Sequence, residues 1–341
     1  MKNRFFLLIL LCFQPILALK ANDSLKLYTI DELVFLSDFE KKSFECIRQN
    51  APCDLFRMAL ATDPAMSSKN YELYKKDFYQ FLGQLKVNKS FSKKPKAQIK
   101  FIFNAIHDKY FKLYKENPLF SEIFSNGNFN CLTASALFAI AFDEFKIPYE
   151  IVLSPVHVYL MAYPNNEGIV VETTNPLKGA DIVVDPKEKT KIVRELIKMK
   201  LVSEEEVSQK GIDKVFSEVY LKNESPDLLQ LIGSLYHNQA VAKAEKLAHY
   251  EAYQALKKSS FLFPRKVTVG ALMFQSALFI GKKDIENKET FKVLGEMDKF
   301  IPFGLPEQAI IEECNNFLSL AYNNKDKTIF DSVYVWLAGN F

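Results

Sequence analysis

The hydrophobic periodicity of this chain changes at Ile147-Pro148, and that change restricts the fold more than any other feature. Over residues 131–145, apolar side chains recur at the spacing of a buried helix. Three short runs rich in β-forming residues follow, at 149–153, 157–163 and 168–173. Proline, glycine and asparagine separate these runs and indicate turns. A helix followed by three short strands predicts an α+β fold.

Helical patterns cover most of the remaining sequence. Residues 24–90 and about 97–115 predict helices before the strands, and residues 187–222 predict another after them. The stretch 71–85 carries aromatic residues on one helical face, at Tyr71, Tyr74, Phe78 and Phe81. Such a stripe is typical of a packed core and not of a cofactor site. Only 11 glycines among 341 residues also favour a mainly helical protein.

The N-terminus has the layout of a secretory signal peptide. Lys2 and Arg4 precede an apolar run from Phe5 to Leu19, and Ala18 and Ala21 offer small residues for cleavage. We therefore predict a signal over residues 1–21 and an exported mature chain, either periplasmic or secreted. The alternative is a retained N-terminal anchor, although the run is short for a membrane span. After signal removal, no integral membrane span is expected.

Charge gives no support for nucleic acid as a partner. The chain holds 44 basic and 41 acidic residues, and the predicted signal contains three of the basic residues and none of the acidic ones. Without the signal the chain would be close to neutral. Net charge therefore gives no electrostatic argument for nucleic acid or an anionic membrane as a partner.

Four cysteines lie outside the predicted signal: Cys46, Cys53, Cys131 and Cys314. They form no Cys-x-x-Cys pair, and the four histidines are scattered, so neither a metal site nor a cofactor is predicted. Cys46 and Cys53 are seven residues apart. An export compartment permits a disulfide between them, and two small buried side chains are the alternative. Cys314 lies in an apolar helical pattern and is expected in the core.

Cys131 opens the predicted helix 131–145, directly after the turn-forming residues 125–128. A thiol at a helix N-terminus faces free backbone N–H groups and the positive end of the helix dipole, which favours the reactive thiolate. The same N–H groups can stabilise the oxyanion that forms when a carbonyl is attacked. Cys131 is therefore the candidate nucleophile, although a lone cysteine at a helix start is more often structural.

His157 and Glu172 are predicted to meet across a hairpin. Alternation places His157 and Tyr159 on one face of the second strand, and Glu172 ends the third strand. If these strands pair about the turn at 164–168, His157 lies near Glu172. A carboxylate beside an imidazole fixes its tautomer and supports its charged form. Each residue alone has an ordinary structural explanation, but their order predicts one shared site with Cys131.

The segment 128–176 resembles the transglutaminase-like superfamily, which shares its core with papain-like enzymes. The family pattern has a cysteine at a helix start, then Ile-Pro, then a strand with His-x-aromatic, then an acid in an apolar strand before a turn. This chain matches it at Cys131, Ser135, Leu137, Phe138, Ile140, Ala141, Ile147, Pro148, His157, Tyr159, Leu160 and Glu172. The resemblance implies N-terminal helices and a Cys-bearing helix packed on a small antiparallel sheet. It also implies Cys131 as nucleophile, His157 as general base and Glu172 as the acid that orients the base.

Two positions depart from the family pattern. The third member is usually Asp, and Glu172 is one methylene longer. A glycine usually precedes Ile-Pro, where this chain has Lys146. Asp181 and Asp185 are lower-ranked candidates for the third role, because both lie beyond the predicted strand.

Residues 238–264 resemble one tetratricopeptide repeat. The resemblance rests on Ala240, on Tyr250-Glu251-Ala252 at the start of a second helix, and on Pro264 closing the unit. Residues 266–300 and 305–337 predict two further, degenerate helical hairpins, and a generic helical bundle is the alternative. A transglutaminase-like domain is accordingly predicted over 22–222, and an all-α repeat domain over 223–341.

Two functions fit these observations. The first is an exported thiol-dependent hydrolase or acyltransferase that acts on amide or peptide bonds of a peptide or protein substrate. The second is an inactive transglutaminase-like scaffold that binds a protein partner through its helical repeats. His107, His237 and His249 are interpreted as structural residues in either case.

Overall fold

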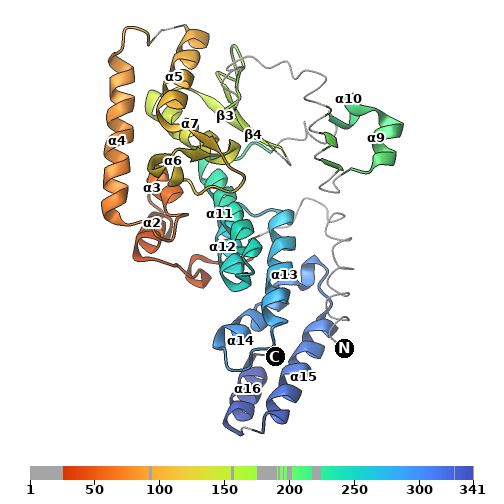
Figure 1. The fold of residues 1–341 in the computed structure, drawn as a ribbon. Helices are drawn as coiled ribbons and strands as arrows, with labels where there is room; N and C mark the ends of the chain where they lie inside the picture. The colour runs from red at the N-terminus through yellow and green to blue at the C-terminus, as the bar shows by residue number, and fades with distance from the viewer. Residues whose placement is uncertain are drawn as a thin grey trace. The chain divides into compact units, whose positions relative to one another are not determined.

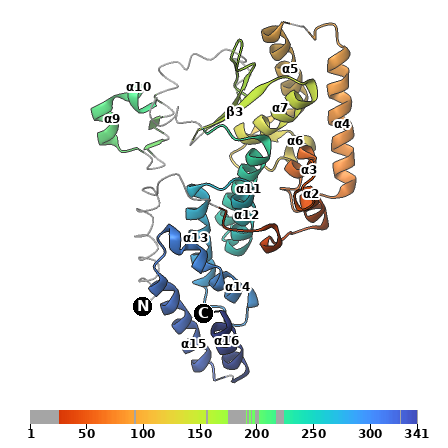
Figure 2. The ribbon, with the colours of Figure 1, turned by 180° about the vertical axis from the view of Figure 1, so that it is seen from behind.

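A computed structural model describes residues 26–91, 94–154, 157–174, 190, 193–194, 196–197, 202–216, 224–325 and 327–340 (Figures 1 and 2). The predicted signal peptide at 1–21 lies outside these residues, as do Asp181 and Asp185. The described part combines many helices with two small sheets, which agrees with the predicted α+β class. Among the described residues, no helix has the length and apolar character needed to cross a membrane.

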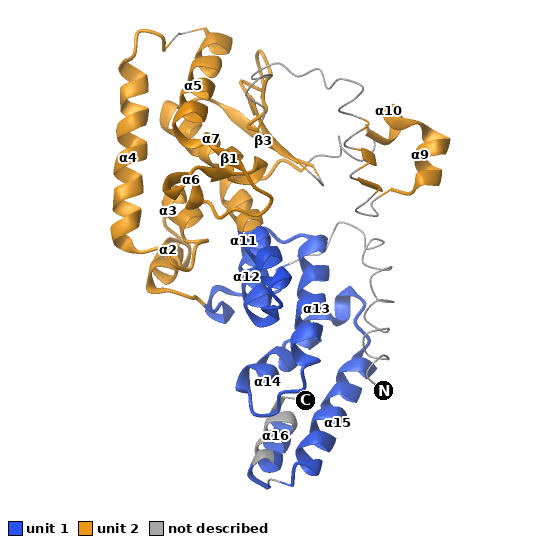
Figure 3. Cartoon of the chain, viewed as in Figure 1, with its two compact units in different colours: residues 1–34, 236–341 blue, residues 35–235 orange. Residues whose placement is uncertain are grey.

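The chain divides into two compact units (Figure 3). Unit 2 comprises Phe35–Leu235, and unit 1 comprises Met1–Val34 together with Tyr236–Phe341. This division differs from the predicted one at two places. The boundary falls inside helix α11 (Leu228–Glu245) instead of at residue 222, and the residues just before Phe35 group with the C-terminal helices.

Unit 2 is built around one helix whose side chains are almost all buried. That helix, α7, spans Cys131–Phe145, the range predicted from the sequence, and its residues 132–142 are all buried. The other helices of its first half are α2 (Asp38–Arg48), α3 (Leu55–Leu60), α4 (Ser68–Val87), α5 (Pro95–Tyr110) and α6 (Glu122–Ser125). Helices α3 and α4 contact α7. A helix without a polar face has to be enclosed in this way.

The predicted aromatic stripe belongs to α4 and is part of this core. Tyr71 and Phe78 are buried, and Tyr74 and Phe81 are partly buried. The Tyr74 ring stacks on Phe124 of α6 at a centroid distance of 5.2 Å. The stripe is thus packing material, as the spacing predicted.

Two sheets flank α7. Strand β1 (Leu113–Tyr114) pairs in parallel with β2 (Asn128–Phe129). The sequence predicts the end of a helix at the position of β1. Strands β3 (Tyr149–Leu153), β4 (Val158–Ala162) and β5 (Ile169–Val171) form an antiparallel sheet in that order. Alternate β4 residues are buried, and β3 and β4 both contact α7. A helix packed on a small antiparallel sheet therefore carries the candidate site.

The predicted helix at 187–222 is not continuous in its described part. Helix α9 (Glu204–Lys210) ends at Gly211, whose φ of 79° departs from helical geometry, and α10 (Ile212–Val215) begins after it. Glycine adopts a positive φ without a steric cost, so the sequence turns here. A small hydrophobic cluster in this region consists of the buried residues Val193, Leu196, Val202, Val215 and Phe216.

Unit 1 consists of helical hairpins. The 3-10 helix η1 (Ile30–Glu32) precedes them. The hairpin elements are the C-terminal part of α11, α12 (His249–Leu262), α13 (Lys266–Ile280), α14 (Lys288–Gly295), η3 (Met297–Phe303), α15 (Glu307–Asn323) and α16 (Lys327–Asn340). Ala240, Ala252 and Ala255, small residues of the first predicted hairpin, are all buried. Helical hairpins thus occupy the predicted ranges, and the repeat family remains a prediction.

A buried polar cluster explains why residues 26–34 belong to unit 1. The hydroxyls of Tyr28 and Tyr253 are 2.9 Å apart, and Tyr253 donates to Glu296 at 2.7 Å. The Lys257 ammonium, whose side chain is 2% exposed, pairs with Glu296 at 2.7 Å and lies over the Tyr28 ring. Tyr28 is itself buried. These contacts join two segments that are far apart in the sequence.

We expect Glu296→Ala to lower the free energy of unfolding by about 3 kcal/mol, because it leaves the Lys257 ammonium buried without its carboxylate. Lys257→Met should lose less, since Glu296 is partly exposed and can turn toward water. Urea unfolding followed by circular dichroism measures both. A larger loss for Lys257→Met would contradict this account of the cluster.

Candidate active site

The first turn of α7 is held by a reciprocal cap. The Asn130 side chain accepts a hydrogen bond from the Thr133 backbone N–H at 2.9 Å, and the Thr133 hydroxyl accepts from the Asn130 N–H at 3.0 Å. Asn130 also donates to the Glu116 carbonyl at 2.8 Å. This cap satisfies buried donors and fixes the position of Cys131, which is partly exposed at the end of an otherwise buried helix.

His157 and Glu172 form the strongest polar contact near Cys131. His157 Nε2 lies 2.6 Å from Glu172 Oε2, with side-chain exposures of only 20% and 12%. The other carboxylate oxygen of Glu172 accepts from the Thr174 hydroxyl at 2.8 Å and from its backbone N–H at 3.3 Å. With both oxygens engaged, the carboxylate is fixed in place against the imidazole.

The hairpin register differs from the predicted one by two residues. Leu160 lies opposite Val171, so continuing the register places Tyr159, not His157, opposite Glu172. His157 is therefore a diagonal neighbour of Glu172. Diagonal neighbours on one face of a sheet are about 7–8 Å apart at the backbone, which long side chains span. A slip of two residues keeps both residues on the same face, so the predicted contact survives it.

Electrostatics place a positive charge between Cys131 and Glu172. Burial lowers the pKa of His157, but hydrogen bonds to Cys131 and Glu172 and their charges outweigh it and raise the pKa to about 10. Burial raises the pKa of Glu172, but its contacts with His157 and Thr174 outweigh this and the net shift is downward. At neutral pH the pair is an imidazolium and a carboxylate. The structure therefore brings Cys131, His157 and Glu172 into one chain of side-chain contacts.

Contacts of the neighbouring residue Thr173 also hold Glu172 in place, and the sequence did not predict them. The Thr173 hydroxyl lies 3.1 Å from the Ser135 hydroxyl, and Thr173 is fully buried. Its carbonyl accepts from His107 Nε2 of α5 at 2.9 Å. Because a carbonyl only accepts, this nitrogen carries the proton. Burial lowers the pKa of His107 despite that bond, so the ring is neutral.

Helical periodicity could have predicted one member of this network, Ser135. Ser135 stands four residues after Cys131, so both lie on one face of the helix. His107 was interpreted as structural, and it does act by holding the backbone next to Glu172. Thr173 gave no signal because its partners come from α5 and α7, far away in the sequence.

The remaining histidines lie between helices of unit 1. His249 Nδ1 is 2.9 Å from Gln275 Oε1, and His237 Nδ1 is 3.4 Å from the Thr268 hydroxyl. Burial and the nearby Arg265 charge lower the pKa of His237 to about 4. Within the described ranges, no group of three His, Cys, Asp or Glu side chains is placed to hold a metal.

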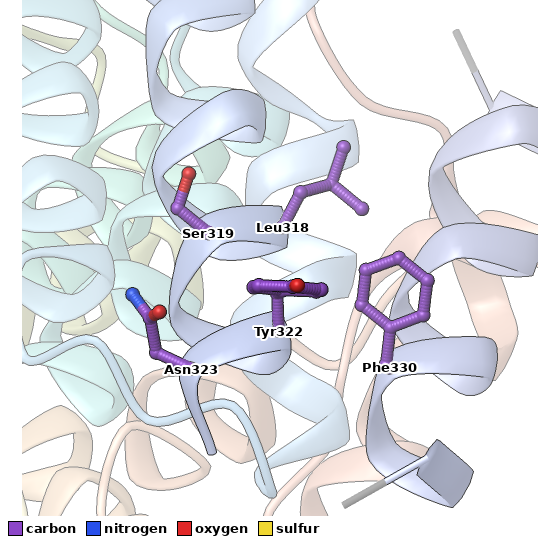
Figure 4. A pocket seen from close by; sticks show the side chains of 5 residues that line it. All are labelled: Leu318, Ser319, Tyr322, Asn323 and Phe330. Carbon is purple, nitrogen blue, oxygen red and sulfur yellow. The ribbon is translucent and has the colours of Figure 1, made fainter. Parts of the chain in front are cut away.

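Two surface pockets lie outside the Cys131 site. One, of about 330 Å³, lies between α15 and α16 and is lined by Leu318, Ser319, Tyr322, Asn323 and Phe330 (Figure 4). The other, of about 470 Å³, lies in unit 2 near the start of β3 and includes Asp143, Tyr149 and Asp227. Neither lining contains Cys131, His157 or Glu172.

In comparisons with known proteins, no family model, curated protein or solved structure matches this chain. The interpretation of the site therefore depends on the geometry of its own residues.

The raised pKa of His157 makes a prediction for stability. A histidine whose pKa rises from 6.5 in the unfolded chain to about 10 in the folded chain stabilises the fold fully below pH 6.5. That contribution is lost as the pH rises toward 10. The difference in unfolding free energy between wild type and His157→Gln should therefore shrink from pH 6 to pH 10 in urea titrations. A constant difference would show that His157 is not charged in the folded protein.

Proposed function

We propose that this chain is an exported thiol-dependent hydrolase or acyltransferase that acts on amide or peptide bonds through Cys131, His157 and Glu172. The observation that carries the proposal is the position of the His157 imidazole, which hydrogen-bonds to a fixed carboxylate and is close enough to the Cys131 thiol to interact with it. Imidazolium beside a thiol stabilises the thiolate, which is the nucleophilic form. A structural role alone does not need three ionisable side chains in this order.

The geometry supports the following reaction. The Cys131 sulfur attacks the carbonyl carbon of the substrate and forms a C–S bond. His157 gives its proton to the departing amine, which leaves behind a thioester on Cys131. Water or a second amine then attacks the thioester carbon, and His157 takes the proton of that nucleophile. The acid or the new amide departs, and the thiolate is restored.

The arrangement around α7 supports the transglutaminase-like interpretation of this unit. The order is a Cys-bearing helix, then an antiparallel sheet whose second strand is preceded by the histidine and whose third strand is followed by the acid. That is the order implied by the resemblance of residues 128–176. The glutamate reaches the imidazole at 2.6 Å, so its extra methylene does not prevent the contact.

A disulfide supports the export part of the proposal. Cys46 at the end of α2 and Cys53 just before α3 are bonded, with their Cα atoms 5.2 Å apart. Disulfides persist in oxidising compartments such as the periplasm and the extracellular space. Together with the signal-like N-terminus, this favours export.

The alternative function is protein binding by unit 1, with or without chemistry in unit 2. Helices α15 and α16 expose large apolar side chains, with Tyr322 73%, Tyr334 56% and Val335 68% exposed. A protein partner could cover such side chains. In the proposed enzyme, this surface would bind a peptide or protein substrate.

Thiol alkylation by iodoacetamide tests the ion pair directly. In a Cys314→Ala background, Cys131 should react rapidly at pH 6, because the neighbouring imidazolium favours the nucleophilic form of the thiol. His157→Ala should slow the reaction at pH 6 by more than about 10-fold.

Two controls frame this experiment. Burial raises the pKa of Cys314 to about 11, so wild type and Cys314→Ala should react alike at pH 6. Cys131→Ala should not react there at all. A reaction rate of Cys131 at pH 6 that is unchanged in His157→Ala would exclude the proposed enzyme.

A further inference from the structure

Strand β1 places Tyr114 next to the start of α7. Tyr114 lies opposite Phe129 in the parallel ladder, and the Lys115 N–H donates to the Phe129 carbonyl at 2.9 Å. The ladder depends on Gly127, whose φ is 81° and where a Cβ atom would lie 2.6 Å from the Lys112 side chain. Phe129 precedes Cys131 by two residues, so this short sheet fixes Tyr114 at the level of the thiol.

The Tyr114 side chain reaches the sulfur from an exposed position. Its ring meets the Phe129 ring edge-on at a centroid distance of 5.9 Å, and its phenol is close enough to Cys131 to interact with it. Tyr114 is 54% exposed, whereas His157 and Glu172 are mostly buried. The sulfur therefore has a buried partner in His157 and an exposed one in Tyr114. A substrate carbonyl that reaches Cys131 from solvent meets this phenol.

The phenol has to be the donor in this contact when the thiol is ionised, because a thiolate only accepts. Burial of the hydroxyl and the nearby charges of Cys131, Glu116 and Glu172 raise the pKa of Tyr114 to about 12. The phenol thus keeps its proton at neutral pH and can offer it to an anion.

We propose that Tyr114 is a catalytic residue that donates a hydrogen bond to the substrate oxyanion formed when Cys131 attacks. As the C–S bond forms, the carbonyl electron pair moves to oxygen, and the phenol donates a hydrogen bond to that oxygen without giving up its proton. The Cys131 backbone N–H stands at the first position of α7, has no acceptor within the helix and supplies the second donor. This inference rests on the proposed thiol chemistry of Cys131.

Two reagents separate this role from a structural one. p-Nitrophenyl acetate acylates a thiolate through an oxyanion and releases p-nitrophenolate, whereas iodoacetamide alkylates it by direct displacement with no oxyanion. Tyr114→Phe keeps the ring and its contact with Phe129 and removes only the hydroxyl. In the Cys314→Ala background, we expect Tyr114→Phe to lower kcat/KM for acylation about 100-fold. The rate of alkylation at pH 6 should change less than about 3-fold.

Tyr159→Phe is the matched control, because it also removes one phenol hydroxyl close to the site. The Tyr159 ring lies 6.3 Å from the His157 ring. It should lower acylation far less than Tyr114→Phe. The inference is overturned if Tyr114→Phe acylates as fast as wild type, or if acylation and alkylation fall together. If wild-type Cys131 acylates no faster than a free thiol, the proposed function fails, and the role of Tyr114 fails with it.

Discussion

The burial of α7 is the constraint on which the rest of unit 2 depends. Eleven consecutive residues of this helix, 132–142, are buried, so it has no face that could be left in water. Helices enclose part of it, and the antiparallel sheet covers another part. Polar groups on such a helix need partners within the protein, which explains the Asn130–Thr133 cap and the contacts of Ser135.

This constraint also accounts for the position of the chemistry. A reactive thiol inside a buried helix would be inaccessible, and at its N-terminus it meets both solvent and free N–H groups. His157 directly precedes β4 and Glu172 directly follows β5, so both lie just outside the paired segments of the strands that cover α7. Thr173, directly after Glu172, contacts both α5 and α7 and so links Glu172 to these helices. Some of the contacts that pack α7 in the core thus also orient the site.

The sequence predicts this unit well where the signal is local. The bounds of α7, the three strands and the alternation of β4 follow from periodicity and turn residues, and the contact between His157 and Glu172 follows from them. The two-residue register difference did not follow, because such a slip leaves every side chain on the same face. The turn that sets the register uses positive φ angles at Tyr163 and Gly168, and Tyr163 carries no sign of this in its residue type.

Non-local contacts account for most of what the sequence missed. Residues 111–115 continue the helical pattern of α5, and only pairing with residues 128–129 makes a strand there. Tyr114 was therefore not predicted near Cys131. In unit 1, the cluster around Tyr28 joins residues more than two hundred positions apart, which no local pattern can reveal.

The far end of α7 from Cys131 shows how the fold separates stability from chemistry. Lys146 ends the helix with a φ of 55°, and the Ile147 N–H closes it on the Phe142 carbonyl at 2.9 Å. This left-handed ending is where glycine is most common, and a lysine there holds a backbone strain of about 1 kcal/mol. The strain is stored a whole helix away from the thiol. Position 146 is therefore a place where the domain can gain stability through mutation, in evolution or by engineering, with no change to the reacting groups.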